Sequence, residues 1–418
     1  MKLTKNHYKF FIIAGEASGD LLGSKLINEL KKQLINKSCS FEFIGIGGKL
    51  MQEQGLDTIF AIEELSLMGF VEILPHIPKL IKLINFTAQQ IIANEVDAVI
   101  SIDAPDFSFR VMNKLNKLLK ENKNLNHSNH PNHPNHPNHP NHQIKKIHLI
   151  APSVWAYRQS RAEKIAKIYN LLLVILPFEP PYFEKFNLKT IFIGHPIIEN
   201  APNLAFREEE KMSFYQRNNI NSDNFLMAIT AGSRNSEVLK IFPQFIETAN
   251  QLFRAGYKFS VALPVVRKTQ DIILSMSKAL EMPYFLIENK EEKHSMMMAC
   301  DIAICKSGTN SLEFSLYQIP LIIGYKINFL SYLILKMLIK VKFANIINLI
   351  ANREVIPEAI QQNCSPRYLL PKIKELLTNK NSAHQQIEDS QKILKILGLE
   401  QTIKPTTKAS IAIIDELN

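Results

Sequence analysis

The chain has 418 residues, of which 46% are hydrophobic and 21% are charged. A chain of this size and composition can bury a substantial core, and its length is typical of a globular protein with two domains. Its four cysteines lack the paired spacing of a zinc site and give no reason to expect disulfides. The formal net charge of +10 implies an anionic partner: a nucleic acid, a phosphorylated substrate or an acidic membrane surface.

The first element is predicted to be a buried strand that leads into a glycine-containing turn. Residues 10–14 are apolar, and this stretch is too short for the hydrophobic region of a signal peptide, so we expect a cytosolic protein. The turn 15–20 then precedes a helix whose leucines recur every four residues. Glycines let a ligand approach the backbone closely, and the start of a helix attracts anionic groups.

The same arrangement of strand, turn and helix recurs along the chain, with similar turns at 231–234 and 306–310. Strands that alternate with helices predict an α/β fold in which parallel sheets are covered on both faces. In such sheets ligands bind beyond the carboxyl ends of the strands, where these polar turns lie. The predicted strands are residues 10–14, 41–48, 96–102, 147–151, 171–176, 190–193, 225–230, 258–263, 284–287, 299–305 and 320–323.

A break in this pattern predicts the domain boundary. Prolines and a charged run interrupt the alternation between residues 196 and 222. We therefore expect a Rossmann-like N-terminal domain over 1–200 and a second one over 201–385, with their parallel sheets facing a central cleft. The remaining helical segment, 386–418, could cross back onto the first domain.

Residues 124–143 are predicted to form a disordered surface insertion. They contain Asn-His-Pro repeated in tandem and hold half of the chain's 12 histidines. Prolines at every third position prevent a helix or a central strand, so we expect an extended, polyproline-like conformation. The histidines could bind a transition metal weakly, but expansion of a repeat in a tolerant loop is the favoured interpretation.

Residues 325–351 combine a long apolar run with lysines. Lys336 interrupts the run, which is shorter than the roughly 20 residues of a membrane-spanning helix. Because Lys336, Lys340 and Lys342 lie beside apolar residues, the segment suits a helix in the interface of an anionic membrane. A dimer or core helix with solvated lysines explains the pattern equally well.

Several short segments, taken together, resemble a known family. Each is a weak signal alone, but they occur in the family's order over nearly the whole chain and are jointly specific. In this respect the chain resembles the lipid A disaccharide synthases. The matching segments are residues 14–20, 65–69, 102–107, 152–158, 176–179, 194–196, 232–234, 307–309 with Glu313, and Asn348 with Arg353 and Glu354.

This resemblance implies an inverting, metal-independent glycosyltransferase of GT-B architecture that uses no cofactor. The family transfers 2,3-diacylglucosamine from UDP-2,3-diacylglucosamine to 2,3-diacylglucosamine 1-phosphate. The products are the β-1,6-linked lipid A disaccharide 1-phosphate and UDP. The resemblance also implies a peripheral protein on the cytoplasmic face of the inner membrane. A homodimer is possible, as the alternative interpretation of residues 325–351 allows.

Transfer to the acceptor hydroxyl requires a base, because the hydroxyl loses a proton as it attacks the anomeric carbon. Asp103 follows a buried strand and is the candidate for this catalytic base. The alternative is that Asp103 or Asp106 caps the next helix.

The departing UDP carries negative charge and requires donors and cations. Arg234 at a helix start could hold the diphosphate, or it could pair with Glu237 on the surface. Glu313 could complete a capping box with Asn310, whereas the resemblance suggests a bond to the ribose hydroxyls. The candidate donor-binding residues are Gly232, Ser233, Arg234, Ser307, Gly308, Thr309, Glu313 and Asn348.

The acceptor is expected at the first glycine turn. The candidate acceptor-binding residues are Glu16, Ser18, Gly19 and Met68, although Ser18 could instead be a helix N-cap. His195 is either a hinge or cleft residue or a packed structural histidine. Trp155 either contacts acyl chains or serves as a core residue or membrane-edge anchor.

The chain departs from the family pattern at Asn310-Ser311, Ile347 and Asn352. These departures leave open the details of the donor loop and the role of Asn348, but they do not affect Asp103 or Arg234. Three rival functions share some features: another UDP-sugar GT-B transferase or epimerase, a nucleic-acid-binding protein, and a membrane-associated scaffold. No helix-turn-helix, zinc-finger or RNP signature supports nucleic-acid binding, and a scaffold does not explain the polar turns at strand ends.

Overall fold

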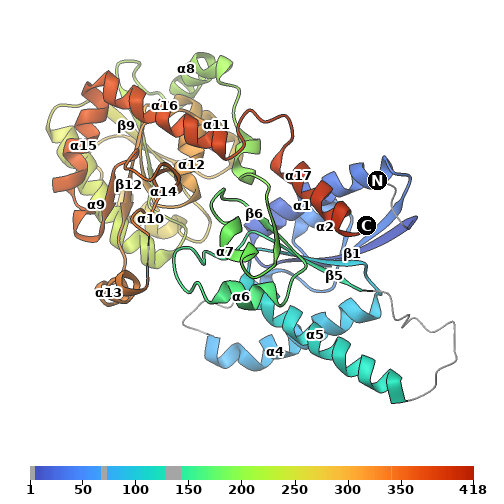
Figure 1. Ribbon diagram of the computed structural model, residues 1–418. Coiled ribbons are helices and arrows are strands. Elements are labelled where there is room, and N and C mark those ends of the chain that lie inside the picture. The colour runs from blue at the N-terminus through green and yellow to red at the C-terminus, as the bar shows by residue number, and fades with distance from the viewer. Residues whose placement is uncertain (1–4, 67–72, 129–142, 340) are drawn as a thin grey trace. The chain divides into compact units, whose positions relative to one another are not determined.

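The computed structural model describes residues 5–66, 73–128, 143–339 and 341–418. The chain forms two compact units (Figure 1), the first made of Met1–Pro196 with Gln401–Asn418 and the second of Ile197–Glu400. Of the helical segment 386–418, which could cross back onto the first domain, residues 401–418 belong to the first unit and residues 386–400 to the second. Met68, residues 129–142 of the predicted insertion and Lys340 of the lysine-containing segment lie outside the described residues.

The first unit is built on seven parallel strands in the order β3-β2-β1-β4-β5-β6-β7. The sequence predicts all of them except β3, which has only three residues. The strands are β1 (His7–Ala14), β2 (Ser40–Ile46), β3 (Leu56–Thr58), β4 (Ala98–Ile102), β5 (Lys145–Leu149), β6 (Leu171–Val174) and β7 (Lys189–Phe192).

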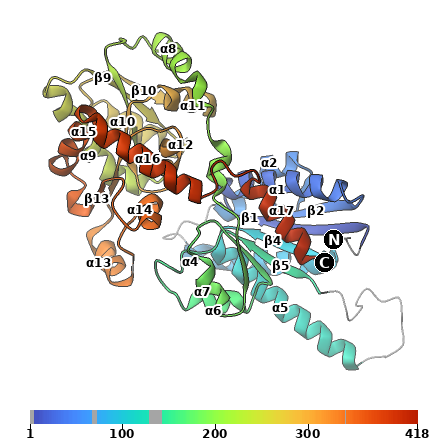
Figure 2. The same cartoon turned by 45° about the horizontal axis from the view of Figure 1, so that its top comes forward.

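Helices cover both faces of this sheet (Figures 1 and 2). The longest, α5, continues to Ser128, so the first residues of the predicted insertion 124–143 are helical rather than disordered. The helices are α1 (Ala17–Ile35), α2 (Lys49–Glu53), α3 (Glu63–Ser66), α4 (Ile73–Ala93), α5 (Pro105–Ser128), α6 (Arg161–Ala166), α7 (Pro180–Glu184) and α17 (Pro405–Glu416).

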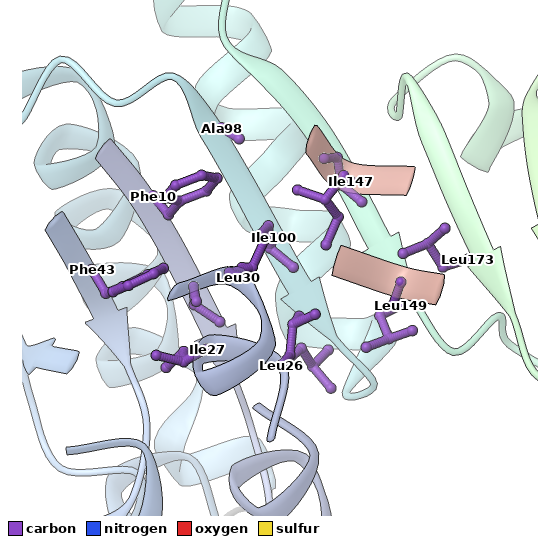
Figure 3. Close-up of a cluster of buried hydrophobic side chains, with 14 of the residues drawn as sticks. Phe10, Leu26, Ile27, Leu30, Phe43, Ala98, Ile100, Ile147, Leu149 and Leu173 are labelled. Atoms are coloured by element: carbon purple, nitrogen blue, oxygen red, sulfur yellow. The ribbon is translucent and has the colours of Figure 1, made fainter. Parts of the chain in front are cut away.

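The core of the first unit follows from the alternation of side chains along its strands. Phe10 and Ile12 of β1 pack on one face against α1, while Phe11 and Ile13 pack on the other against α4 and α5. Figure 3 shows the first of these clusters, in which Leu26, Ile27 and Leu30 of α1 lie over β1, β4 and β5. Burial on both faces explains why the strands read as continuous apolar runs.

The C-terminal helix α17 completes the core of the first unit. Its buried residues Ala409, Ile413 and Ile414 join the cluster formed by α1 and the sheet. At its end, Glu416 forms ion pairs with Lys145 at 3.1 Å and with Lys189 at 3.0 Å. The chain therefore leaves the first unit at residue 196 and returns to it from residue 401.

The second unit is built on six parallel strands in the order β10-β9-β8-β11-β12-β13. The short edge strand β13 is not predicted by the sequence. The strands are β8 (Phe225–Thr230), β9 (Phe259–Pro264), β10 (Tyr284–Ile287), β11 (Ile302–Lys306), β12 (Leu321–Tyr325) and β13 (Glu358–Ile360). The parallel α/β architecture expected for both halves is confirmed.

The helices of the second unit also lie on both sides of its sheet. Helix α9 packs with α10 and α15 over an apolar cluster that includes Phe242 and Phe245. The helices are α8 (Arg207–Arg217), α9 (Asn235–Arg254), α10 (Gln270–Ser277), α11 (Lys290–Ala299), α12 (Thr309–Leu316), α13 (Phe329–Leu338), α14 (Ile346–Ala351), α15 (Pro366–Thr378) and α16 (Lys380–Ile396); η1 (Pro196–Asn200), η2 (Leu204–Phe206) and η3 (Gln361–Asn363) are single 3₁₀ turns.

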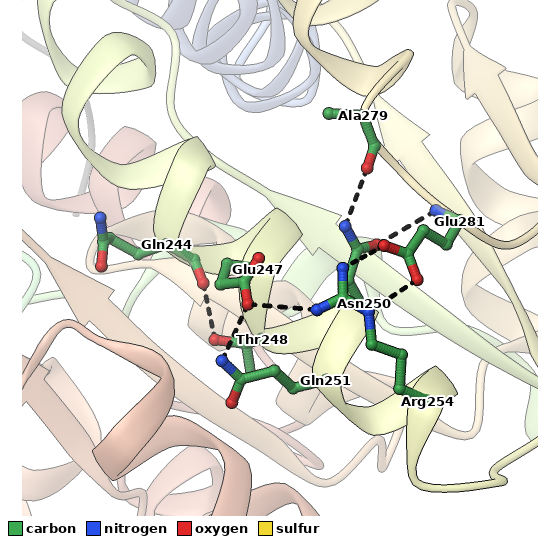
Figure 4. A network of polar contacts seen from close by, with 8 residues as sticks. All are labelled: Gln244, Glu247, Thr248, Asn250, Gln251, Arg254, Ala279 and Glu281. Carbon is green, nitrogen blue, oxygen red and sulfur yellow. Dashed lines mark hydrogen bonds and ion pairs between the residues drawn. The ribbon is translucent and has the colours of Figure 1, made fainter.

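A polar network fixes the C-terminal half of α9 to the segment that follows α10 (Figure 4). The Asn250 amide donates to the Ala279 carbonyl at 2.8 Å and accepts from the Glu281 N–H at 3.1 Å. Arg254 pairs with the Glu281 carboxylate at the end of the helix. This buried asparagine sets the orientation of α9, whose opposite end begins at the polar turn 231–234.

Each sheet has one point at which the strand order reverses. In the first unit this point lies between β1 and β4, and in the second it lies between β8 and β11. Ligands of open α/β sheets bind outside the carboxyl ends of the strands at such a switch point. The turns that follow these four strands are therefore the parts of the fold from which a site is expected.

Candidate active site

In the second unit the switch point opens into a cavity of about 450 Å³. The turns after β8 and β11 form its walls together with the segments after β9 and β10 and the first turns of α11. Five of the predicted donor-binding residues line it: Gly232, Ser233, Ser307, Gly308 and Thr309. The fold thus brings together two turns that are more than 70 residues apart in the sequence, as the predicted strand ends imply.

The backbone of both turns requires glycine. Gly232 has φ +119° and Gly308 has φ +151°, conformations that side chains rarely adopt. Gly308 directly precedes α12, whose N-terminus carries no side-chain cap. An open helix start at the cavity wall supplies N–H groups and a partial positive charge to an anionic ligand. Because Gly308 is the N-cap, the capping box proposed for Asn310 and Glu313 does not form.

A lysine that the sequence analysis did not single out provides a cation at the cavity wall. Lys306, at the end of β11, lines the cavity, and its Nζ lies 3.1 Å from Oε1 of Glu237. The Glu237 side chain is only 9% exposed. Its second oxygen, Oε2, has no hydrogen-bond partner among the described residues. A buried carboxylate thus holds the ammonium group beside the glycine turn.

Arg234 lies at the N-cap of α9, next to this pair. Its side chain is 73% exposed, and its guanidinium group is 3.7 Å from the Glu237 carboxylate. This is the contact that the alternative interpretation of Arg234 expects. Glu237 therefore forms ion pairs with two side chains: Lys306 at the cavity, and the more exposed Arg234. Binding of a diphosphate by Arg234 stays a prediction.

Glu313 lies on α12 behind the cavity wall. Its carboxylate pairs with Lys293 Nζ at 2.7 Å, and Lys293 itself lines the cavity. In this arrangement Glu313 orients a second cation, and its contact with ribose hydroxyls stays a prediction.

Asn348 is fully buried inside a loop network. Its amide donates to the Ile356 carbonyl at 2.7 Å and to Glu358 Oε1 at 2.8 Å, and it accepts from the Val355 and Ile356 N–H groups. All of its hydrogen-bonding groups therefore have protein partners. The same network contains Asn345, which caps α14. Asn348 shapes the segment beside the cavity, whereas a direct contact with the donor stays a prediction.

In the first unit the switch point places Asp103 beside the first glycine turn. Asp103 and Ala104 follow β4 with φ +50° and +44°, two successive left-handed residues. Such strained conformations persist only where the surroundings impose them, and they concentrate at functional sites. The Asp103 N–H donates to the Leu149 carbonyl at 3.0 Å, which anchors this turn to the end of β5.

The environment of Asp103 suits a proton acceptor. Burial raises the pKa of its carboxyl group above the ordinary value, and a hydrogen bond from the Ala104 N–H partly opposes this shift. A carboxylate with a raised pKa is a better base near neutral pH. Asp106, by contrast, is exposed and pairs with Arg161 at 3.2 Å.

The first glycine turn contacts this strained segment directly. An ideal Cβ on Gly15 would lie 2.4 Å from the Ala104 Cβ. Glu16 and Ser18 are exposed at the start of α1, while Gly19 is buried against Ala14. Glu16 occupies the N-cap position, so the alternative N-cap role for Ser18 is wrong.

Asp20, which the sequence analysis left unassigned, has a structural role. Its buried carboxylate accepts from the N–H groups of Gly48 at 2.8 Å, Met51 at 3.1 Å and Leu50 at 3.2 Å. It therefore caps the N-terminus of α2. The position of Asp20 in a glycine-rich motif did not indicate this contact with residues 48–51, which lie about 30 positions along the chain.

Two further predicted residues, Trp155 and His195, lie near the carboxyl ends of β5 and β7. The Trp155 indole N–H donates to Oε1 of Glu179 at 3.1 Å, and its ring meets Phe178 edge-on at 5.3 Å. His195 is buried, and burial lowers its pKa to about 4. Within the described ranges, no three His, Cys, Asp or Glu side chains gather as a metal site.

Two units with doubly wound parallel sheets, each with a polar site at its switch point, define a protein with the fold of GT-B glycosyltransferases. A glycosyltransferase from Rickettsia africae has this fold with a TM-score of 0.55 and 11% identity over 99% of both chains. MurG from Acinetobacter baumannii matches with a TM-score of 0.52 and 12% identity over 94% of this chain and 99% of its own.

The chain belongs to the lipid-A-disaccharide synthetase family, whose model matches residues 10–127 and 138–412. A lipid-A-disaccharide synthase from Rickettsia bellii is 39% identical over 98% of this chain and 99% of its own length. The predicted family is thereby confirmed. Another UDP-sugar GT-B enzyme is not favoured, because the similarity to such enzymes is one of fold alone.

Proposed function

We propose that the protein transfers 2,3-diacylglucosamine from UDP-2,3-diacylglucosamine to 2,3-diacylglucosamine 1-phosphate. The acceptor 6-hydroxyl attacks the anomeric carbon of the donor as its proton passes to the Asp103 carboxylate. A β-1,6 bond forms with inversion at this carbon, and the bond from the carbon to the phosphate oxygen breaks. UDP leaves with both electrons of that bond.

The observation that carries this proposal is the cavity at the second switch point. It combines an open helix start at Gly308, a glycine turn at Gly232 and the cations Lys306 and Lys293. These groups suit the negative charge that develops on a departing diphosphate. Asp103 supports the acceptor part of the proposal. Burial raises the pKa of its carboxyl group, and the residue lies in a turn of strained backbone.

The test is a reaction with both lipid substrates. Purified protein is incubated in detergent and EDTA with the UDP-linked donor and the acylated 1-phosphate, and the disaccharide and UDP are quantified together. We expect equimolar formation of the two products. Release of UDP without disaccharide, or epimerisation of the donor sugar, would contradict the proposal and favour the alternative class of UDP-sugar enzyme.

We also propose that α13 carries the protein to an anionic membrane surface at the cytoplasmic face of the inner membrane. Met337 is 88% exposed, Leu338 45% and Leu333 42%, and Lys336 and Lys342 are exposed beside them. Apolar side chains between lysines fit the boundary between lipid head groups and acyl chains. No helix in the described part of the chain is both long and apolar enough to cross a bilayer.

Vesicle sedimentation tests this second proposal. Replacing Lys336 and Lys342 with Gln should reduce binding to vesicles that contain anionic lipid, and Met337→Ser should reduce it further. The control is Lys278→Gln, on the exposed end of α10. Unaltered vesicle binding by the Lys336, Lys342 and Met337 variants, together with loss of a dimer in sedimentation velocity, would instead assign α13 to a homodimer contact.

A further inference from the structure

The segment that follows β5 is held by a buried carboxylate. Glu179 is 2% exposed, and both of its oxygens accept a hydrogen bond: Oε1 from the Trp155 indole N–H at 3.1 Å, and Oε2 from the Leu176 N–H at 2.9 Å. Phe178, next to Glu179, packs edge-on against the same indole ring. Trp155 is thus fixed at two points to the turn that follows β6.

This segment is strained at both ends. Ile150 has φ +73° and Arg158 has φ +53°, although neither is a residue type that favours the left-handed region. Strain of this kind persists only where contacts impose it. Between these two positions, Trp155 ties the segment to the turn that follows β6 through its hydrogen bond to Glu179 and its ring contact with Phe178.

The segment is also connected to Asp103. The Asp103 N–H donates to the Leu149 carbonyl at 3.0 Å, and the next residue, Ile150, donates to the Leu173 carbonyl at 3.0 Å. The carboxyl ends of β4, β5 and β6 are therefore linked in order. A displacement of the segment that follows β5 moves the residue that anchors the backbone of Asp103.

We propose that Glu179 is a positioning residue for the transfer reaction: its carboxylate holds Trp155 and thereby fixes the segment 150–158 and the Asp103 turn beside it. Packing alone does not require an acid at this position. A buried charge is unfavourable unless it is hydrogen-bonded, and a neutral side chain of similar size would be more easily accommodated. The effect on turnover rests on the proposed function, whereas the contact itself does not.

Protonation of Glu179 is expected to weaken this attachment. Burial raises its pKa to about 7, and the hydrogen bonds from Leu176, Trp155 and Ile175 only partly oppose the shift. No charged side chain of the described residues contributes to it. Since both oxygens already face N–H donors, a proton on either oxygen competes with one of them. The buried histidines of this unit, His148 and His195, have pKa values lowered to about 3 and about 4 and do not titrate in this range.

The chain offers a direct probe, because Trp155 is its one tryptophan. Intrinsic tryptophan fluorescence of the full-length protein is recorded from about pH 5.5 to about pH 8.5. We expect a change in emission with its midpoint near the pKa of Glu179, about 7. Glu179→Gln should abolish this transition, and the control Glu184→Gln, at the exposed end of α7, which begins directly after Glu179, should retain it. A flat wild-type titration, or an unchanged transition in Glu179→Gln, would overturn the proposal.

A second variant keeps the proposal testable if Glu179→Gln does not fold. Trp155→Phe retains an aromatic ring against Phe178 and removes the N–H donor together with one ring of the indole. We expect kcat to fall about 5- to 10-fold, the equivalent of one hydrogen bond, with UDP affinity unchanged. Since protonation of Glu179 should slow turnover, kcat should fall on the acid side of a pH near 7, and this point should shift in the variant. Wild-type kcat and pH profile in this variant would refute the positioning role, while absence of disaccharide from the wild-type enzyme would refute the proposed function alone.

Discussion

The Gly15 backbone lies so close to Ala104 that a Cβ on Gly15 would be 2.4 Å from the Ala104 Cβ. The two residues follow β1 and β4, which are neighbours at the first switch point. Glycine at position 15 therefore allows the left-handed turn at Asp103 and Ala104 to close against the start of α1.

The variant Gly15→Ala tests this contact. Because the added methyl group has no space, we expect a loss of about 1–3 kcal/mol in the free energy of unfolding. Turnover should fall as well, because the turn that carries Asp103 must move. Gly256→Ala is the contrast: Gly256 has φ +90° but nothing lies within 4 Å of its Cβ position, so it should lose stability without a change in kcat. Unaltered kcat in Gly15→Ala would contradict the link between this turn and Asp103.

Replacing Asp103 with Asn separates catalysis from stability. Asn adopts left-handed backbone readily, so the turn is retained while the base is lost. We expect kcat to fall about 10²- to 10⁴-fold with unchanged UDP affinity. Asp106→Asn, which removes only an exposed ion pair with Arg161, is the matched control. Substantial activity in Asp103→Asn would remove this residue from the base role.

The pH dependence of Asp103 has opposite signs for activity and for stability. Its pKa is raised by burial, so kcat/KM should fall as the pH decreases through a value above the ordinary 3.8. A raised pKa means that the folded state binds the proton more tightly than the unfolded state. The contribution of Asp103 to stability is therefore present at low pH and lost as the pH rises. Asp103→Asn should consequently have a higher Tm than the wild type at neutral pH, which differential scanning calorimetry can measure.

Lys306 is predicted to bind the diphosphate of the donor. Lys306→Met keeps most of the length of the side chain but removes its charge. We expect UDP affinity to fall about 10- to 100-fold, as for a hydrogen bond to a charged group. Calorimetric titrations with UDP and with uridine show whether the loss concerns the diphosphate or the nucleoside, since uridine lacks the phosphates. An equal loss for both ligands would show that the cavity itself is damaged. Lys278→Met, away from the cavity, serves as the control.

Replacing Asn348 tests whether this residue has a structural role or contacts the donor. Asn348→Ala leaves the N–H groups of Val355 and Ile356 without their acceptor, so we expect about 2–4 kcal/mol of destabilisation by denaturant titration. The exposed Asn363→Ala should change stability by less than about 0.5 kcal/mol. A wild-type unfolding curve combined with a raised KM for the donor would instead establish the contact that the family resemblance implies.

The sequence predicts most of the fold because its signals are local. Buried strands of parallel sheets appear as apolar runs, and the turns at 15–20, 231–234 and 306–310 contain the small residues that their backbones require. The strands β3 and β13 have three residues each, too few to show a period. Their pairing depends on neighbouring strands rather than on their own composition.

The partners of the site residues could not be predicted in the same way. Lys306 and Glu237 are 69 positions apart, and Trp155 and Glu179 are 24 apart. Only the completed sheets bring each pair together, so residue type and spacing gave no indication of which acid holds which donor. The local pairing of Arg234 with Glu237, three positions along one helix, was visible as an alternative for that reason.

The return of the chain to its first unit sets an order for folding during synthesis. Ile413 and Ile414 of α17 fill the apolar surface beside α1, and Glu416 neutralises two lysines at the start of β5 and β7. A nascent chain that still lacks these residues exposes that surface to solvent. The half that is translated first is therefore the last to be completed, because it becomes a finished domain only after α17 has been synthesised and has packed against α1.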